Sequence, residues 1–354
     1  MAEVLLLDGV DIAGQAVDGM QPLHVACNKC RDHRLTEMIR LFLDTGADAN
    51  CVDRIGRRPL HLASMRKNPQ AIRLLVNRGA DLEAEIGQIR GRTPLQIASG
   101  CFGNISSVRT LLELGANVNI EPPSSYIPLE AAVFGNELEI VKELLQHGAD
   151  PNLQCAGNTE TIVIRYASWT FNLGFGACNE ILMTIVKHGA DIHAQDRAGN
   201  QVLHFLALCT PGQLTTTSHR STEQLIRYLI QKGANPNAQN HKQETPLSLA
   251  ILSRDFLFVR LVLKSGKGYL SMTQKQRLTN YLLELKAHNV NPYPYDTGVD
   301  RMIALFKEFP STNESLGIEN TRTDGSSNEM EVGASDAVQQ IPGSEVADHV
   351  MIPC

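Results

Sequence analysis

A short glycine motif recurs along most of this chain at nearly constant intervals. Gly-Ala-Asp or Gly-Ala-Asn places its glycine at positions 46, 79, 115, 148, 189 and 233, and Ser-Gly-Lys takes the seventh place at Gly266. The successive intervals are 33, 36, 33, 41, 44 and 33 residues. A period of this length is typical of arrays in which one supersecondary unit stacks on the next. It predicts an elongated solenoid rather than one compact globular domain.

A second motif lies upstream of six of these glycines. Its versions are QPLHVA from Gln21, RPLHLA from Arg58, TPLQIA from Thr93, IPLEAA from Ile127, QVLHFL from Gln201 and TPLSLA from Thr245. Proline fits the first turn of a helix, where its missing N–H would be unpaired anyway. Apolar runs such as IRLLV (72–76) have helical spacing, and the glycine that follows suits a left-handed helix end. Each unit is therefore predicted to be a helix, a turn, a second helix and an extended hairpin.

The two motifs in phase resemble the ankyrin repeat, which has a 33-residue period and a T-P-L-H-x-A box. The resemblance covers roughly residues 1 to 270 and implies an all-α fold with short β-hairpin fingers. That fold would be an ankyrin-repeat solenoid of about seven stacked helix-turn-helix units plus a helical C-terminal cap. In this family the box histidine, here at His24, His61 and His204, hydrogen-bonds to neighbouring loops. The family's hairpin asparagine closes the finger and is hydroxylated in some members; it stands here at Asn50, Asn119, Asn152 and Asn237.

The repeats divide the chain into four segments. Residues 1–18 are read as a partial N-terminal repeat, because VLLLDGVDI (4–12) matches the end of a second helix with no box before it. Either the natural chain starts further upstream or this edge docks on another molecule. Residues 19–272 hold about seven repeats, and residues 273–309 are predicted to form a helical cap. Residues 310–354 are predicted to be an acidic disordered tail.

Charge is distributed unevenly between the tail and the body. From residue 311 onward eight acidic residues accompany one base, Arg322, so the tail carries −7; the total charge of −6 leaves the body near +1. A flexible tail of this length has a root-mean-square reach of about 35–40 Å, so it could touch basic fingers of its own body. A nearly neutral body without a long basic stripe and interleaved aromatic residues argues against nucleic acid as a partner.

No pattern typical of catalysis occurs in the sequence. We find no glycine-rich phosphate loop, nucleophile elbow or zinc-protease helix, so we expect no enzyme activity, no catalytic or cofactor-binding residues and no small-molecule substrate. Eight scattered cysteines without a hydrophobic leader favour a reducing compartment, the cytoplasm or the nucleus, and we expect no membrane contact. The protein is expected to be a monomer.

The segment HVACNKCRDH (24–33) spaces two histidines and two cysteines at steps of three, which raises the alternative of a zinc site. In one continuous helix, steps of three turn each side chain by about −60° relative to the last. Four such side chains spread over about 180° and cannot meet one tetrahedral ion. The segment is better interpreted as a repeat helix followed by a lengthened turn, with no metal site.

A basic cluster on the N-terminal half is our first candidate for binding a partner. Its members are Arg54, Arg57 and Arg58 on one finger, Arg90 and Arg92 on the next, and Arg66 with Lys67 between them. Such a charge group is usually only a solvated face. Its clustering on adjacent fingers nevertheless favours an acidic protein partner held by charge complementarity.

Lengthened turns in units one, five and six are the second candidate, because insertions in repeat arrays emerge on one face that often binds. In unit five, Arg165 replaces the box histidine, and about six residues are added within WTFNLGFGACNE (169–180). Trp169, Phe171 and Phe175 in this segment are candidate partner anchors. The competing interpretation is that these rings fold back and fill a packing gap in the degenerate unit. The insertion of unit six, residues 209–221, is expected to be a polar loop.

Two functions remain open at this level. The first is a non-enzymatic scaffold that holds a protein partner on its hairpin fingers, inner helices and inserted turns. The second is a substrate-recognition adaptor of a larger complex such as a ubiquitin ligase. No Cys-Arg-containing box of the suppressor-of-cytokine-signalling type was found after the repeats.

Overall fold

The computed structural model describes most of the repeat region. The described residues are 11–29, 33–87, 92–120, 127–154, 160–173, 179–208, 216–253 and 255–266, with 276, 279–280, 283 and 303–305; for 33–35, 171–173 and 216–219 only the backbone is described. Within these ranges no helix is both long enough and apolar enough to cross a bilayer.

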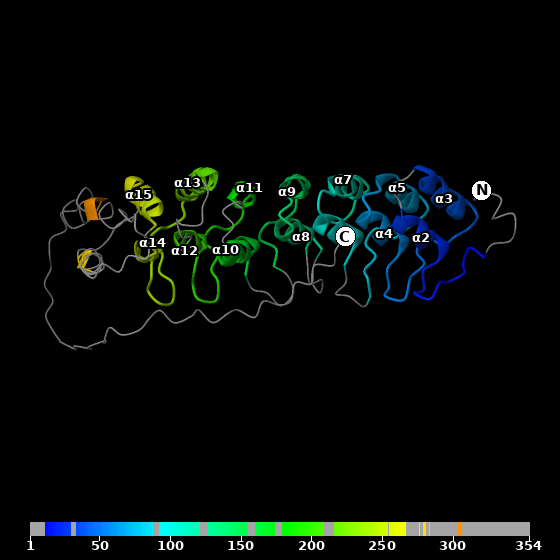
Figure 1. The fold of residues 1–354 in the computed structure, drawn as a ribbon, viewed down its shortest axis with the longest axis horizontal. Helices are drawn as coiled ribbons and strands as arrows, with labels where there is room; N and C mark the ends of the chain where they lie inside the picture. Colours follow the sequence, from blue (N-terminus) through cyan, green and yellow to red (C-terminus); the bar gives the residue numbers. More distant parts are fainter. Residues whose placement is uncertain are drawn as a thin grey trace.

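Seven helix pairs follow one another and form two parallel rows (Figure 1). The pairs are α2 (Pro22–Lys29) with α3 (His33–Asp44), α4 (Pro59–Met65) with α5 (Pro69–Asn77), α6 (Pro94–Gly100) with α7 (Ile105–Glu113), α8 (Pro128–Phe134) with α9 (Leu138–Gln146), α10 (Ile162–Leu173) with α11 (Asn179–Lys187), α12 (Val202–Ala207) with α13 (Thr216–Gln231), and α14 (Pro246–Leu252) with α15 (Phe256–Lys264). The first helix of each pair packs on the first helices of its neighbours, and the second helices do the same. The first row lies between the fingers and the second row.

Local sequence explains where these helices begin and end. Five of the first helices start at the box proline, and Thr93 and Thr245 cap α6 and α14 with their side chains. Asn68 and Asp255 cap the second helices α5 and α15 in the same way. All seven motif glycines, from Gly46 to Gly266, have positive φ, as a left-handed helix end requires. The predicted boundaries of the repeat helices therefore follow from capping chemistry.

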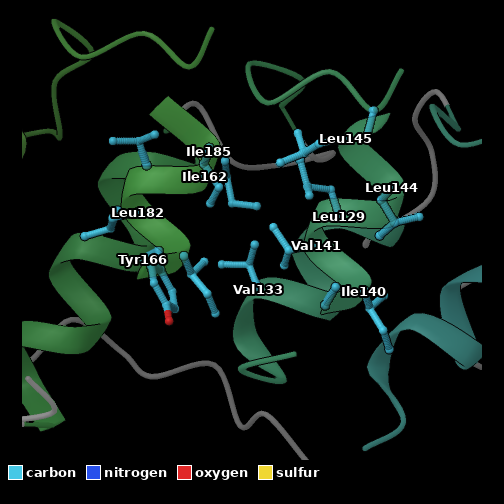
Figure 2. Close-up of a cluster of buried hydrophobic side chains, with 14 of the residues drawn as sticks. Leu129, Val133, Ile140, Val141, Leu144, Leu145, Ile162, Tyr166, Leu182 and Ile185 are labelled. Atoms are coloured by element: carbon cyan, nitrogen blue, oxygen red, sulfur yellow. The ribbon is translucent and has the colours of Figure 1, made fainter. Parts of the chain in front are cut away.

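The core is a continuous apolar layer between the two rows. Figure 2 shows it at units four and five, where Leu129 and Val133 of α8 meet Val141 and Leu144 of α9. Across the unit boundary, Tyr166 of α10 is fully buried, and its hydroxyl donates to Asn136 Oδ1 at 3.4 Å. The box alanines, such as Ala63 and Ala98, are also fully buried, because first helices approach each other closely there. Stability thus comes from many interfaces between neighbouring units.

The fingers differ from the predicted β-hairpins. No β-strand occurs among the described residues, and the fingers at 53–57 and 196–200 are turns closed by a backbone bond, from Asp53 N to Arg57 O (3.0 Å) and from Asp196 N to Asn200 O (3.0 Å). The side chain of Asp53 or Asp196 accepts the next amides of its turn, at 2.7–3.1 Å. Side-chain bonds therefore take the place of a strand ladder.

Two insertions were also only partly predicted. In unit five α10 continues to Leu173, so the predicted loop at 169–180 begins as helix, and its residues 174–178 lie outside the described residues. In unit six α13 starts at Thr216, so the second half of the expected loop at 209–221 is helical. The upstream residues of α13, Thr216 to Ser221, are polar, so the helix takes up part of the insertion without adding apolar positions.

Residues 303–305 are helical and lie beyond α15 at the end of the array (orange in Figure 1). Leu305 is buried and Ile303 packs against the core, so this short helix covers apolar surface. The boundaries proposed for the cap, for the partial N-terminal repeat and for the acidic tail fall mainly outside the described residues and remain predictions.

Gly19→Ala is expected to loosen the first finger more than Gly46→Ala. Both glycines have positive φ, which costs an L-residue about 1–2 kcal/mol. A Cβ on Gly46 would meet nothing within 4 Å, whereas one on Gly19 would lie 2.8 Å from the backbone nitrogen of Arg54. That amide donates to Asp18 O at 3.1 Å. Hydrogen exchange should therefore speed up at the Arg54 amide in Gly19→Ala only; equal exchange in the two variants would contradict this.

Candidate interaction surface

Three of the finger asparagines tie each repeat to the next. The side-chain Nδ2 atoms of Asn50, Asn119 and Asn152 donate to the carbonyls of Gly79, Gly148 and Gly189 at 2.8, 2.8 and 3.0 Å. Their Oδ1 atoms accept from the amides of Asp81, Asp150 and Asp191, each at 2.8 Å. The resemblance implied that this asparagine closes its own finger; at these three positions its side-chain bonds instead link one repeat to the next. The fingers are held in fixed register before any partner arrives.

The box histidines fasten the first helices to the fingers. Nδ1 of His61 accepts from the Arg58 amide at 3.0 Å, and Nε2 donates to Ala84 O at 2.9 Å. His24 and His204 make the same pair of contacts, to Arg57 O at 3.0 Å and Glu244 O at 3.2 Å. Burial lowers the pKa of all three imidazoles, and that of His61 falls to about 4. These rings are neutral structural connectors, as the resemblance implied.

Most of the predicted basic cluster is engaged within the molecule. Arg57 Nε donates to Asp53 Oδ2 at 2.7 Å, and Arg58 Nη1 lies 3.1 Å from Asn50 Oδ1 and 3.4 Å from Asp81 Oδ2. Arg54 is exposed at the finger tip, and its side chain has no hydrogen bond or ion pair with a described residue. Of this finger's three arginines, Arg54 is the one whose charge is fully available to a partner.

The other members of that cluster lie apart from the finger. Arg66 and Lys67 follow the far end of α4, and Arg66 Nε donates to Asn28 Oδ1 at 3.0 Å. The seven residues of α4 rise about 10 Å, so one continuous cluster is not formed. Arg92 is half-buried and has an interaction of its own, and Arg90 lies outside the described residues. Among the described members, helix α4 separates the finger of Arg54, Arg57 and Arg58 from Arg66 and Lys67, so these two groups do not form one continuous patch.

Trp169 lies in helix α10 and not in a protruding loop. Its ring stacks on Tyr166 with centroids 5.8 Å apart, and meets the edge of Phe134 at 5.6 Å. The ring is half-buried against the core, so it fills space in unit five as the competing interpretation expected. The side chain of Phe171 and all of Phe175 lie outside the described residues.

A buried ion pair sits beside this aromatic cluster. Glu130 of α8 and Arg165 of α10 occupy the box-histidine position of their units, and the two side chains pair directly. Glu130 is 2% exposed, and the Arg165 guanidinium also lies over the Phe134 ring, 5.1 Å from its centroid. The pair therefore joins units four and five where the imidazole connector is missing.

The sequence reasoning missed Phe102, the most exposed aromatic side chain among the described residues, at 82%. It lies in the turn between α6 and α7, next to Gly103. Lys67, Gly103 and Asn136 hold equivalent positive-φ positions in consecutive turns, and Gly103 N donates to Glu137 Oε1 at 3.0 Å. Alignment of the repeats could have identified Phe102 from the sequence. It places Phe102 at the same position of the turn as Arg66 and Gly135, where those two repeats have no large apolar side chain. Its exposure in a solvent-facing turn makes Phe102 a candidate contact residue for a partner.

We call the side chains along this edge the turn strip: Arg66, Lys67, Phe102, Phe134 and Trp169. It runs across the ends of the first helices in units two to five, with cations at one end and rings at the other.

A metal site finds no support in the structure: within the described ranges no group of three or more His, Cys, Asp or Glu residues could hold an ion. Residues 30–32 of the HVACNKCRDH segment lie outside those ranges.

Comparison with known proteins agrees with this architecture. A family model described as "Ankyrin repeats (3 copies)" matches residues 1–86, 30–122 and 82–155. The crystal structure of the human ASB11 ankyrin repeat domain superposes with a TM-score of 0.50 at 20% identity, covering 63% of this chain and 90% of that one. This chain is an ankyrin repeat protein. The predicted all-α solenoid is thereby confirmed.

Two curated relatives share the repeats within much longer proteins. The chain is 30% identical over 242 residues to human SH3 and multiple ankyrin repeat domains protein 2, covering 66% of this chain and 12% of that protein. It is 22% identical over 262 residues to the E3 ubiquitin-protein ligase KEG of Arabidopsis thaliana, covering 72% of this chain and 15% of the ligase. Ankyrin repeats are in general a protein-interaction module, and these likenesses extend only to that module.

Proposed function

We propose that this ankyrin repeat protein is a non-enzymatic scaffold that holds a protein partner along its fingers and turn strip. The observation that carries the proposal is Phe102, whose ring is 82% exposed between the cations of unit two and the rings of units four and five. An exposed aromatic anchor beside cations fits a partner segment with apolar and acidic residues. Arg54 at the finger tip adds a further available charge.

Pre-organisation supports the same proposal. The asparagine and histidine bonds fix each finger to its neighbours, so a partner need not order this surface on binding. We further propose that the protein acts as a monomer in the cytoplasm or nucleus, without nucleic acid, membrane or small-molecule ligands. Arg57, Arg58, Arg66 and Arg92 then serve mainly to shape two separate surfaces, the finger that presents Arg54 and the turn strip that presents Lys67 and Phe102.

Quantitative affinity purification of the full chain tests this function. Replacing Phe102 with Ser should reduce recovery of the specific partner about thirtyfold, which corresponds to an aromatic hot spot of about 2 kcal/mol. Leu252→Ser is the matched control, because Leu252 is 45% exposed at the end of the first helix of unit seven. Equal recovery with both variants would exclude Phe102 as the anchor.

The alternative function is a substrate-recognition adaptor of a ubiquitin ligase. The observation favouring it is the likeness to the ligase KEG over 72% of this chain. The same purification separates the two functions. Cullin-type or other ligase subunits that remain bound when Phe102→Ser releases the partner would support the adaptor. Recovery of the partner without any ligase subunit would favour the plain scaffold.

A further inference from the structure

The second helices of the N-terminal units neutralise one another's charges. Arg78 of unit two pairs with Asp44 of unit one at 2.5 Å, and Arg109 of α7 with Glu143 of α9 at 2.9 Å. Arg73 of α5 likewise pairs with Glu113 of α7. Between units one and four, cations and carboxylates thus alternate across the unit boundaries. This part of the second row offers a partner little uncompensated charge.

The second helices of units five to seven are different. Residues 179–188, 220–232 and 255–264 contain six Lys or Arg residues and three acids, one of which, Asp255, is a buried helix cap. Lys187 and Lys232 lie over the Tyr228 ring, at 5.9 and 5.6 Å from its centroid. The acid that contacts Arg227 is Glu223, on the same helix. Arg260 and Lys264 have no ion pair with any described residue.

A groove opens beside two of these cations, Arg227 and Lys264. It has a volume of about 240 Å³, and its lining residues are Arg227, Ile230 and Gln231 of α13 with Leu261, Lys264 and Ser265 of unit seven. Ile230 and Leu261 form an apolar floor, since both are nearly fully buried. The exposed side chains of Arg227 and Lys264 line the same groove. An aliphatic side chain fits this floor, and carboxylates on either side of it would meet the cations.

We propose that this basic face, defined as Lys187, Arg227, Lys232, Arg260 and Lys264, binds an acidic peptide segment of a protein partner. The partner seats an aliphatic side chain between α13 and α15, and its carboxylates pair with the surrounding cations. A peptide fits better than nucleic acid, which needs a longer basic groove with several rings for stacking. It also fits better than a membrane surface, because the apolar element is a recessed groove and not a protruding ridge.

The basic face is independent of the turn strip. It lies on the second helices of units five to seven, whereas the turn strip lies in the turns and first helices of units two to five. In Figure 1 the first row also lies between this face and the fingers. A scaffold with both surfaces can hold two partners at once. Failure of the basic face to bind would leave the function proposed for Phe102 untouched.

Fluorescence anisotropy with the full-length protein tests the proposal. The probe is a labelled synthetic peptide with leucines three or four residues apart, so that they share one face of a helix, and glutamates at the positions between them. The double variant Lys232→Glu, Lys264→Glu should weaken binding about tenfold or more, because two screened attractions become repulsions. The matched control is Lys29→Glu, Lys242→Glu, which makes the same charge change at exposed lysines outside the second row. Binding should also weaken with added salt.

A second variant tests the groove without changing charge. Gln231→Trp places a ring over the apolar floor and should abolish the advantage of the leucine peptide over one with serine in place of leucine. The proposal fails if the double variant and its control bind equally. It also fails if an oligonucleotide or phosphatidylserine vesicles compete for the basic face more strongly than the peptide does. It fails as well if crosslinking shows that residues 311–354 of the same chain occupy the site at Lys264. Circular dichroism confirms that each variant is folded.

Discussion

Arg165→Ala is expected to lower the free energy of unfolding by about 3–5 kcal/mol, a large share of the stability of an ordinary domain. The loss arises because Glu130, 2% exposed in α8, would be left buried without the guanidinium that now pairs with it. Removal of the cation from the Phe134 ring adds to the effect. Urea unfolding followed by circular dichroism measures the change.

The double variant Glu130→Leu, Arg165→Leu is the control. A pair of apolar side chains of similar volume removes both charges together, and such replacements are often neutral or stabilising. The double variant should therefore recover most of the loss. If Arg165→Ala costs less than about 1 kcal/mol, the pair is not an important link between units four and five. Because repeat arrays unfold through nearest-neighbour interfaces, Arg165→Ala should also broaden or split the unfolding transition.

This link could not be predicted from the box motif alone. Glu130 and Arg165 were each visible as departures from the box histidine, but the motif does not say that two departures in adjacent units compensate each other. The stacking of equivalent positions explains it, since first helices place residue four of consecutive boxes side by side. Two opposite charges at equivalent positions in neighbouring repeats are therefore a signal that the sequence does contain.

Helix boundaries were predictable because their determinants are local. The box proline, the capping threonine and the positive-φ glycine act within a few residues of the backbone that they fix. Whether an arginine side chain is available to a partner was not predictable in the same way. Arg58 lies near Asn50 and Asp81, which are 8 and 23 residues away in sequence, so its availability depends on how two fingers fit together. Composition records the charge of such residues but not their partners.

The aromatic residues show the same limit. Trp169 attracted attention as the single tryptophan in an irregular segment, yet α10 carries it into contact with Tyr166 and Phe134. Phe102 passed unnoticed because its turn is only one residue longer than the turns of units two and four, although it is the ring that faces solvent. Alignment of the turns, residue by residue, would have separated the two cases, since exposure follows position in the repeat more closely than it follows residue type.

Acid is expected to destabilise the array between pH 6.5 and about 4 through its box histidines. Burial lowers the pKa of His61 from 6.5 to about 4, so in this window the unfolded chain binds a proton that the folded chain does not. The contribution of His61 is fully present above pH 6.5 and falls by roughly 3 kcal/mol as the pH approaches 4. His24 and His204 have pKa values lowered by the same cause and act in the same direction.

Asp255 works against this trend and supplies a control. Burial raises its pKa from 3.8 to about 6, so the folded chain binds the extra proton there, and this contribution is lost as the pH rises through 6. His61→Gln should flatten the fall in stability below pH 6.5, because Gln96 already makes the same contact with the Thr93 amide in unit three, at 2.8 Å. Asp255→Ser should keep the cap and steepen the fall. Urea midpoints measured at intervals from pH 7.5 to pH 4 distinguish these outcomes, and parallel curves for the wild type and His61→Gln would show that His61 does not set the acid sensitivity.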